Sequence, residues 1–518
     1  MTTSNLRHSQ QLLVGEALRR AAFRSPDMEA YVYEEQRLTY RQMEQRVLHL
    51  AGWLQAQGLG YDDKVGFILR NELAFPEVFF AVALAGTVGV PINFRLAGDE
   101  IDYIVNHSDS KILFIGREFV ETIQAIRQRL PQVETIVVVG SQDEVPGMVR
   151  YKSIFEQPVS FTPCERLTDD DACMIVYTSG TTGRPKGAVL THKNLYMNSM
   201  NMIAFSGLRP QNKQLVVPPL FHVAAMSTLV TTTLLGGTTV IHREFEPVKI
   251  LETIQAERIT QLFLVPAMWN FLFQVPNIEQ YDLSSLTSCS TGGAICPLEL
   301  KKRIMHYFPN ANLYEAFGQT EMSPCATVLG HEDILRKTTS VGKPALNVEV
   351  RIVDDEMNDV PVGEVGEIVY RGPTVMKEYY KNPEATAEAF RGGWFHSGDL
   401  VRMDEEGFVY VVDRKKDMII SGGENIYPAE IEEVLYTHPG ILEAAVIGVP
   451  DETWGETVKA VVVPKPGAQL TAEEVIAHCT RHLASYKKPR IVEFVEVLPR
   501  NAAGKVLKRV LREAHQTR

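Results

Sequence analysis

The stretch Tyr177–Gly187, which reads YTSGTTGRPKG, decides how the rest of the chain is interpreted. Apolar, strand-like runs flank it, ACMIV at Ala172–Val176 and AVL at Ala188–Leu190. Its glycines allow backbone N–H groups to approach a ligand closely. Its hydroxyls add neutral donors, and Arg184 and Lys186 add positive charge. Because N–H groups and cations together suit a polyphosphate, the stretch predicts a phosphate-binding loop between two strands.

Two other interpretations fit this loop less well. A surface turn is often rich in Gly and Thr, but few turns combine so many donors with a lysine. A Walker-type loop needs Gly-x-x-x-x-Gly-Lys-Ser/Thr and a following helix. Here Pro185 replaces the second glycine, Gly187 replaces the magnesium-binding hydroxyl, and an apolar β-like run follows. Both the residues and their context therefore exclude the Walker type.

Residue for residue, the loop resembles the phosphate-loop signature of the adenylate-forming superfamily, which comprises acyl- and aryl-CoA synthetases, luciferases and the adenylation domains of peptide synthetases. The resemblance covers essentially the whole chain, from Leu38–Tyr40 and VPINFRL at Val90–Leu96 to Lys505. It implies an enzyme that binds ATP and joins a carboxylic acid to AMP. The loop residues that the resemblance places on ATP are Thr178, Ser179, Gly180, Thr181, Thr182, Gly183 and Lys186.

Composition sets limits on the class of protein. At 518 residues the chain exceeds one ordinary core. Its net charge of −12 argues against non-specific nucleic-acid binding. The 6 cysteines lack Cys-x-x-Cys spacing, which is typical of reduced thiols in a cytoplasmic protein. The N-terminus has no signal-peptide core, and the longest apolar run, Val78–Pro91, is too short to span a bilayer and predicts a buried helix and turn.

Alternating helical and strand-like patterns predict an α/β fold with parallel-type sheets. The predicted strands include KVGFIL at Lys64–Leu69 and TIVVV at Thr135–Val139. Short strands and turns after about residue 345 predict a small β-subdomain, and a compact α+β pattern follows Asp413. We therefore expect a large N-terminal adenylation domain at 1–413 and a mobile C-terminal domain at 414–518, with a hinge in the charged segment 413–416.

The motif YEAFGQTE at Tyr314–Glu321 lies at a predicted strand end, where open α/β sheets bind ligands. Glu321 suits Mg²⁺, because hard cations prefer carboxylates, and Phe317 can stack on a purine. A helix capped by Thr320 is an equal alternative from these residues alone. The motif resembles the family's adenine-and-magnesium motif, although Phe317 lacks the hydroxyl of the usual tyrosine. The resemblance implies a metal site at Thr178 and Glu321, and further nucleotide contacts at Gly292, Gly293, Ala294, Glu315, Ala316, Phe317, Gly318 and Thr320.

Three motifs in the last part of the chain extend the resemblance. In WFHSGDL, Asp399 is either an ordinary turn residue or, as the family implies, the carboxylate that accepts the ribose hydroxyls. The segment DRKK at 413–416 is by itself a solvated charge run. Next to the family's hinge-and-tunnel motif, it implies Arg414 on the ribose side and Lys416 at the hinge. The implied tunnel for the pantetheine of CoA consists of Ser421, Gly422, Gly423 and Glu424.

Lys505 ends the motif PRNAAGK. A lone terminal lysine is usually only solvated, but its position resembles that of the family's catalytic lysine. A flexible ammonium can neutralise the charge that develops between carboxylate and α-phosphate. The resemblance implies that the C-terminal domain then rotates about Lys416, which removes Lys505 and presents the CoA tunnel.

The acid is expected near PPLFHVAAM at Pro218–Met226, where His222 occupies the family's position against the carboxylate. A satisfied core histidine is an equal alternative from the residue alone. Small, apolar neighbours leave room for a hydrophobic tail, and the absence of the peptide-synthetase Asp disfavours an amino acid. The predicted acyl pocket consists of His222, Val223, Ala224, Met226, Ser290, Gly318 and Met322.

The residues and the resemblance together predict an ATP-dependent acid–CoA ligase with Lys505, Lys186, Glu321 and His222 as catalytic residues. Its partners are a small carboxylic acid, ATP, Mg²⁺ and CoA, and it is a monomer or homodimer in which peripheral membrane association stays open. A medium- or long-chain fatty acid is favoured over an aryl acid of the 4-coumarate or benzoate type. The retained catalytic set disfavours a non-catalytic acyl- or nucleotide-binding protein, and no motif distinguishes a luciferase-like monooxygenase.

Overall fold

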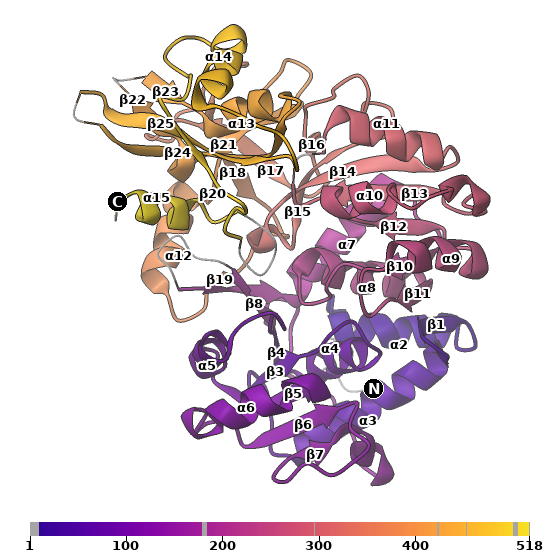
Figure 1. The fold of residues 1–518 in the computed structure, drawn as a ribbon. Coiled ribbons are helices and arrows are strands. Elements are labelled where there is room, and N and C mark those ends of the chain that lie inside the picture. The colour runs from indigo at the N-terminus through magenta and orange to yellow at the C-terminus, as the bar shows by residue number, and fades with distance from the viewer. Residues whose placement is uncertain are drawn as a thin grey trace. The chain divides into compact units, whose positions relative to one another are not determined.

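The computed structural model describes residues 10–178, 184–294, 296–421, 424–451, 453–500 and 506–516. The chain forms two compact units (Figure 1). The first comprises Met1–Val350 and Tyr370–Phe395, and the second comprises Arg351–Val369 and His396–Arg518. The predicted hinge segment 413–416 lies within the second unit, and its role as a hinge stays a prediction.

The first unit contains an 8-stranded sheet in the order β19-β9-β8-β4-β3-β5-β6-β7. Neighbouring strands from β8 to β7 run parallel, whereas β9 is antiparallel to both β8 and β19. Helices α5 (Gly98–His107) and α6 (Val120–Ile126) pack their isoleucines against it. The strands are β3 (Lys64–Ile68), β4 (Val88–Pro91), β5 (Ser110–Gly116), β6 (Thr135–Val139), β7 (Val149–Arg150), β8 (Ala172–Thr178), β9 (Lys186–Thr191) and β19 (Glu378–Tyr379).

A 9-stranded sheet completes the first unit, in the order β16-β15-β14-β13-β12-β10-β11-β1-β2. Its central strands run parallel, and β2, β15 and β16 are antiparallel additions. The strands are β1 (Glu29–Tyr33), β2 (Gln36–Thr39), β10 (Lys213–Val216), β11 (Thr238–Ile241), β12 (Gln261–Phe263), β13 (Ser288–Gly292), β14 (Asn312–Gly318), β15 (Cys325–Leu329) and β16 (Lys343–Pro344). The predicted α/β class is confirmed, with mixed rather than purely parallel sheets.

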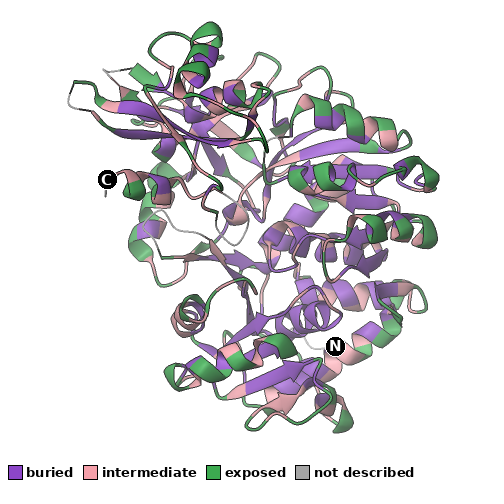
Figure 2. Cartoon of the chain, in the orientation of Figure 1, coloured by how far each residue is buried: buried purple, intermediate pink, exposed green. Residues whose placement is uncertain are grey.

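The helices of the first unit include α9 and α11, each of which buries one face and exposes the other (Figure 2), and α4, which is buried along its whole length. They are α2 (Val14–Arg24), α3 (Tyr40–Ala56), α4 (Ala74–Ala85), α7 (His192–Ser206), α8 (Val223–Leu235), α9 (Pro247–Glu257), α10 (Pro266–Leu272), α11 (Leu298–Tyr307) and α12 (Pro383–Ala389). The apolar run Val78–Pro91 forms most of buried α4, a turn at Gly86 with φ of +76°, and β4. Among the described residues, no helix is long and apolar enough to cross a membrane.

The second unit combines a 4-stranded sheet, β17-β18-β20-β21, with a 5-stranded sheet in which β23-β22-β25-β24 are neighbours and β26 pairs with β25. On β24, Ala444 and Val446 face a core with α13 and α14, while Ala445 and Ile447 face a core with Leu511 of α15. This alternation is the period of a strand buried on both faces. The elements are β17 (Glu349–Val353), β18 (Gly366–Arg371), β20 (Phe395–Met403), β21 (Val409–Arg414), β22 (Ile419–Ser421), β23 (Glu424–Ile426), α13 (Pro428–Tyr436), β24 (Ile441–Asp451), β25 (Gly455–Pro464), α14 (Ala472–His482), β26 (Ile491–Phe494) and α15 (Lys508–Gln516).

Candidate active site

The predicted phosphate loop joins the antiparallel strands β8 and β9, as expected from the flanking sequence. Thr178 is the register partner of Lys186, and its Oγ1 donates to the Lys186 carbonyl oxygen at 3.5 Å. A Cβ on Gly187 would lie 2.7 Å from Ile175 Cγ2, so the pairing of the two strands requires glycine here. The remaining predicted loop contacts, Ser179, Gly180, Thr181, Thr182 and Gly183, lie outside the described residues.

Lys186 and Glu321 both contact Tyr379, a residue that the sequence did not single out. The Lys186 ammonium lies 5.0 Å from the centroid of the Tyr379 ring, which is a cation–π distance. The Tyr379 hydroxyl donates to Glu321 Oε1 at 2.8 Å. Burial, and the adjacent carboxylate, raise the pKa of Tyr379 well above its ordinary value, so this hydroxyl stays a donor. Strand β19 is only two residues long, so no periodicity marks it in the sequence.

Glu321 lies in the single turn η5 (Thr320–Met322) after β14 and is only 7% exposed. The alternative in which Thr320 caps a helix is wrong, because Gln319 occupies the cap position and no side chain caps this turn. The described residues contain no group of three or more metal-ligating side chains. Within the same described residues, the Glu321 carboxylate accepts from the neutral Tyr379 hydroxyl and forms no ion pair, which fits Mg²⁺ of the kind held by one carboxylate and substrate phosphates.

The carboxyl ends of β13 and β14 bring several predicted nucleotide residues to one sheet edge. Gly292 lies opposite Ala316, and a Cβ on Gly292 would lie 2.5 Å from the Ala316 carbonyl oxygen. Gly318 has φ of +157°, and a Cβ there would lie 2.1 Å from the Pro324 carbonyl oxygen. Phe317, beside Gly318, is half-buried, as are Ala316 and Thr320, whereas Gly293 and Ala294 after β13 are exposed. These glycines permit the close strand-end packing that a nucleotide site of this type needs.

The Glu315 side chain faces the core instead. Its carboxylate is 2.6 Å from the Lys301 ammonium, and both side chains are almost fully buried. The Cys296 N–H donates to the same carboxylate at 3.2 Å. The carboxylate therefore has a cation and an N–H donor within the protein, and the predicted nucleotide contact of Glu315 stays a prediction.

His222 stands immediately before α8, with its ring 4.2 Å from the ring of Phe221. Burial, with a smaller contribution from Arg95, lowers the pKa of His222 to about 4, so the imidazole is neutral at neutral pH. Of the other predicted pocket residues, Ala224 is half-buried, as is Gly318. The rest are packed almost completely: Val223 at 5%, Met226 at 0%, Ser290 at 8% and Met322 at 0% exposure.

Asn71, which the sequence analysis did not single out, forms hydrogen bonds with the loop that precedes His222. Its Nδ2 donates to the carbonyl oxygens of Val217 and Pro218, each at 3.1 Å. Its Oδ1 accepts from the Leu220 N–H at 2.8 Å. Asn71 is buried, so this amide replaces the backbone pairing that an irregular buried loop lacks.

In the second unit, Asp399 and Arg414 are register partners on β20 and β21, and their charged groups lie 2.6 Å apart. Lys416 lies in the short turn η7 (Lys415–Asp417), where burial lowers the pKa of its ammonium. Ser421 and Glu424 face each other across the β22–β23 pair. Gly422, Gly423 and Lys505 lie outside the described residues, so their predicted roles stay predictions.

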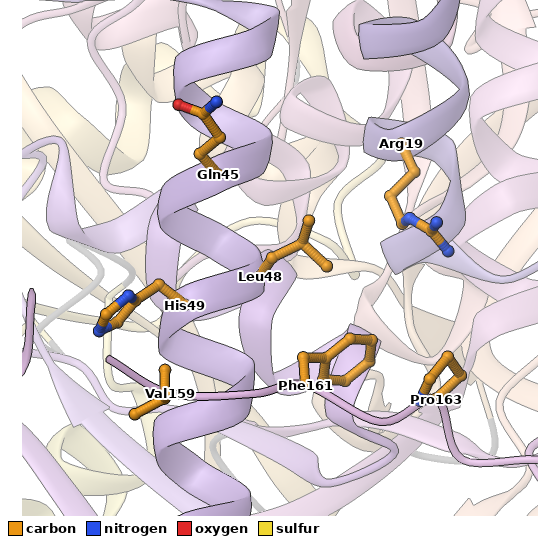
Figure 3. Close-up of a pocket in the computed structure, with 7 residues that line it drawn as sticks. All are labelled: Arg19, Gln45, Leu48, His49, Val159, Phe161 and Pro163. Carbon is orange, nitrogen blue, oxygen red and sulfur yellow. The ribbon is translucent and has the colours of Figure 1, made fainter. Parts of the chain in front are cut away.

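A hollow on the first unit lies among side chains of α2, α3 and the segment 159–163 (Figure 3). Its lining mixes polar and apolar groups: Arg19, Gln45, Leu48, His49, Val159, Phe161 and Pro163. The imidazole of His49 is hydrogen-bonded to the Ile154 carbonyl oxygen at 2.8 Å. None of the predicted site residues belongs to this hollow.

This chain is similar to known protein families and structures over most of its length. Residues 18–380 match the AMP-binding enzyme family, and residues 430–505 match the AMP-binding enzyme C-terminal domain. A feruloyl-CoA synthase of an Amycolatopsis species is 42% identical over 94% of this chain and 96% of its own. The long-chain-fatty-acid–CoA ligase FadD13 of Mycobacterium tuberculosis is 37% identical over 97% of this chain and 98% of its own. The structure of o-succinylbenzoate coenzyme A synthetase from Bacillus subtilis with ATP and magnesium ion has a TM-score of 0.84 and 29% identity, and the match covers 95% of this chain and 98% of that one.

Proposed function

The chain belongs to the AMP-binding enzyme family of adenylate-forming enzymes, and from this premise we propose that it is an AMP-forming acid–CoA ligase whose substrate is an aromatic carboxylic acid. Cytoplasmic location is part of the proposal. The cysteines at 164, 173, 289, 296, 325 and 479 are all free thiols, which suits a reducing compartment.

The proposed reaction has two steps. First, a carboxylate oxygen of the acid attacks the α-phosphorus of ATP, and the bond to pyrophosphate breaks. Second, the sulfur of CoA attacks the acyl carbon, and the bond to AMP breaks, which leaves a thioester. The CoA thiol reacts as the thiolate, its stronger nucleophilic form, so its proton is released to solvent. AMP leaves the acyl carbon readily, whereas an unactivated carboxylate would have to expel an oxide ion.

Each step draws on residues of this chain. Lys186 binds phosphate oxygens, and Glu321 with Thr178 would hold Mg²⁺, which would neutralise part of the phosphate charge. Asp399 accepts from the ribose hydroxyls, and the Arg414 guanidinium lies 2.6 Å from its carboxylate. His222, neutral and next to Phe221, lies against the acid. Lys505 is assigned to the adenylation step, and Ser421–Glu424 to the passage of pantetheine.

The packing around the start of α8 and the turn η5 supports the choice of an aromatic acid. Met226 and Met322 are fully buried, so these two predicted pocket residues fill space instead of lining a long channel. The surfaces left half-buried, at His222, Ala224 and Gly318, are small and suit a flat ring. The 42% identity to a feruloyl-CoA synthase supports the same choice.

A medium- or long-chain fatty acid is the second candidate. The apolar character of α8 and the 37% identity to a long-chain-fatty-acid–CoA ligase favour it. Aliphatic tails need only a sufficiently deep apolar pocket, so the two candidates differ in pocket depth rather than in mechanism.

An acid panel separates these candidates. AMP and thioester are measured with ferulate, 4-coumarate, benzoate, octanoate and palmitate, each with and without CoA. We expect CoA-dependent AMP release to be greatest with an aromatic acid. A maximum with octanoate or palmitate would replace the aromatic proposal by the second candidate. Lys505→Ala is the matched mechanistic variant: it should lose adenylate formation but still convert a supplied acyl-adenylate and CoA into thioester.

A further inference from the structure

We propose that Tyr379 is a positioning residue that holds Glu321 and Lys186 in place for Mg·ATP and keeps their opposite charges from pairing with each other. The inference rests on the proposed ATP-binding function. It concerns one short segment of the first unit, Met376–Tyr380, which includes β19. Neither the phosphate-loop motif nor the Tyr314–Glu321 motif contains this segment.

The segment forms hydrogen bonds with Glu321 at two points, one on its main chain and one on its side chain. The Met376 N–H donates to the Glu321 carbonyl oxygen at 2.7 Å, which holds the main chain of the turn. The Tyr379 hydroxyl donates to Glu321 Oε1 at 2.8 Å, which holds the side chain. Glu321 lies in a single turn and not in a regular helix, so the turn alone does not fix the direction of its side chain. The two hydrogen bonds from the segment fix that direction.

The same segment pairs with strand β9, which begins at Lys186. The Lys377 N–H donates to the Val189 carbonyl oxygen at 2.9 Å, and the Tyr380 N–H donates to that of Gly187 at 2.8 Å. Tyr379 is thereby set opposite Ala188, and its ring lies 5.0 Å from the Lys186 ammonium. One segment therefore connects the phosphate-loop strand to the magnesium-site turn.

Two helices hold the segment itself. The Tyr379 N–H donates to Thr386 Oγ1 of α12 at 3.0 Å. On the other side, the amide of Asn194, in the first turn of α7, donates to the carbonyl oxygens of Pro373 and Val375 at 2.8 and 2.9 Å. Asn194 is itself buried. The main chain is thus held at Tyr379 and again just before Met376. This limits the movement of the Tyr379 side chain and therefore of Glu321, to which it is hydrogen-bonded.

The charge arrangement explains why a tyrosine suits this position. Within the ranges that the structure describes, neither Lys186 nor Glu321 takes part in an ion pair. If the two charges paired directly, each would lose the attraction that it needs for phosphate oxygens or for a divalent cation. The ring face stabilises the cation and the hydroxyl stabilises the carboxylate. Both charges are held by a neutral residue and remain available to the ligand.

The test measures ATP affinity by calorimetry on the full chain, with saturating Mg²⁺ and separately with EDTA. Tyr379→Phe keeps the ring and removes the hydroxyl, so Mg·ATP affinity should fall about tenfold while ATP affinity in EDTA stays within about twofold. Tyr379→Leu removes both groups and should weaken binding under both conditions. Tyr380→Phe is the matched control, since its hydroxyl donates to Asp109 at 2.9 Å and not to the site, and it should bind as wild type.

A second test compares the effect of Tyr379→Phe in the wild-type protein with its effect in the Glu321→Gln variant. If Tyr379 acts through Glu321, adding Tyr379→Phe to Glu321→Gln should cause no further loss of Mg·ATP affinity. Wild-type Mg·ATP affinity in Tyr379→Phe, or fully additive losses in the double variant, would overturn this inference alone. Absence of ATP binding by the wild-type protein would overturn the proposed function and the inference with it.

Discussion

Two buried glutamates, Glu315 in β14 and Glu321 just beyond its end, have opposite surroundings. Glu315 is 3% exposed and has the Lys301 ammonium 2.6 Å away. Glu321 is 7% exposed, and the partner of its side chain is the neutral hydroxyl of Tyr379. Within the described part of the chain, a carboxylate paired with a cation and a carboxylate without a cationic partner therefore lie six positions apart.

The difference teaches what distinguishes a structural carboxylate from one kept for a ligand. A buried carboxylate with a close cation and a backbone donor is electrostatically complete, although its desolvation cost is high. The charge of a buried carboxylate that has only a neutral donor is balanced when a cation binds together with the substrate phosphates. Burial alone does not separate the two, whereas the charge of the partner does.

Removal of the Glu321 charge should have the largest effect on the reaction. Glu321→Gln keeps the shape of the side chain but weakens the attraction for a divalent cation. We expect kcat/KM for acid-dependent AMP release to fall about 1,000-fold, or about 4 kcal/mol. The midpoint of thermal unfolding should stay close to wild type. Nearly normal turnover by this variant would remove Glu321 from the magnesium site.

Removal of the Lys301 charge should have the largest effect on stability. Lys301→Met leaves the Glu315 carboxylate buried without its cation, so unfolding free energy in urea should fall by about 3 kcal/mol. Turnover at a temperature where the variant is folded should stay within about threefold. Lys302→Met is the control, because its pair with Glu299 is exposed and should contribute less than about 1 kcal/mol. Equal effects of the two variants would contradict a structural role for the Lys301–Glu315 pair.

His222 extends the comparison to a half-buried side chain that carries no charge at neutral pH. Its folded pKa of about 4 lies below the ordinary value of 6.5, so its contribution to stability is present above pH 6.5 and is lost as the pH falls toward 4. His222→Phe should reduce the acid-induced loss of unfolding free energy over this window by about 2 kcal/mol. His192 and His242 also have pKa values lowered to about 4 by burial, so the difference between variant and wild type isolates His222. Identical pH profiles of stability would contradict its burial in the neutral form.

The smallest expected effect belongs to Asn71, which acts through the backbone of the loop before His222. Asn71→Ala removes three hydrogen bonds to this loop and should raise KM for the acid about tenfold, with kcat little changed. The KM for ATP should not change. An equal rise in both KM values would show that the substitution disturbs more than the acid pocket.

Where the signal is local, the sequence predicts the fold well. The strands on both sides of the phosphate loop and the strand pattern of β6 are confirmed, because each depends on neighbouring residues. Tyr379 and Asn71 were missed because they act across 58 and 149 residues, respectively. No periodicity or spacing encodes such contacts. Whether Met226 and Met322 line the acyl pocket depends on how deeply they are packed in the fold. The type of a side chain does not reveal how deeply it is packed.

The measurement that tests the central claim most directly is the exchange of labelled pyrophosphate into ATP, with the preferred acid present and CoA absent. If the first step forms an acyl-adenylate, label should enter ATP only when the acid is present, and wild type should show this while Glu321→Gln and Lys505→Ala should not. Addition of CoA should then yield AMP and thioester in equal amounts. No acid-dependent exchange, with ADP and phosphate as the products of turnover, would contradict the account.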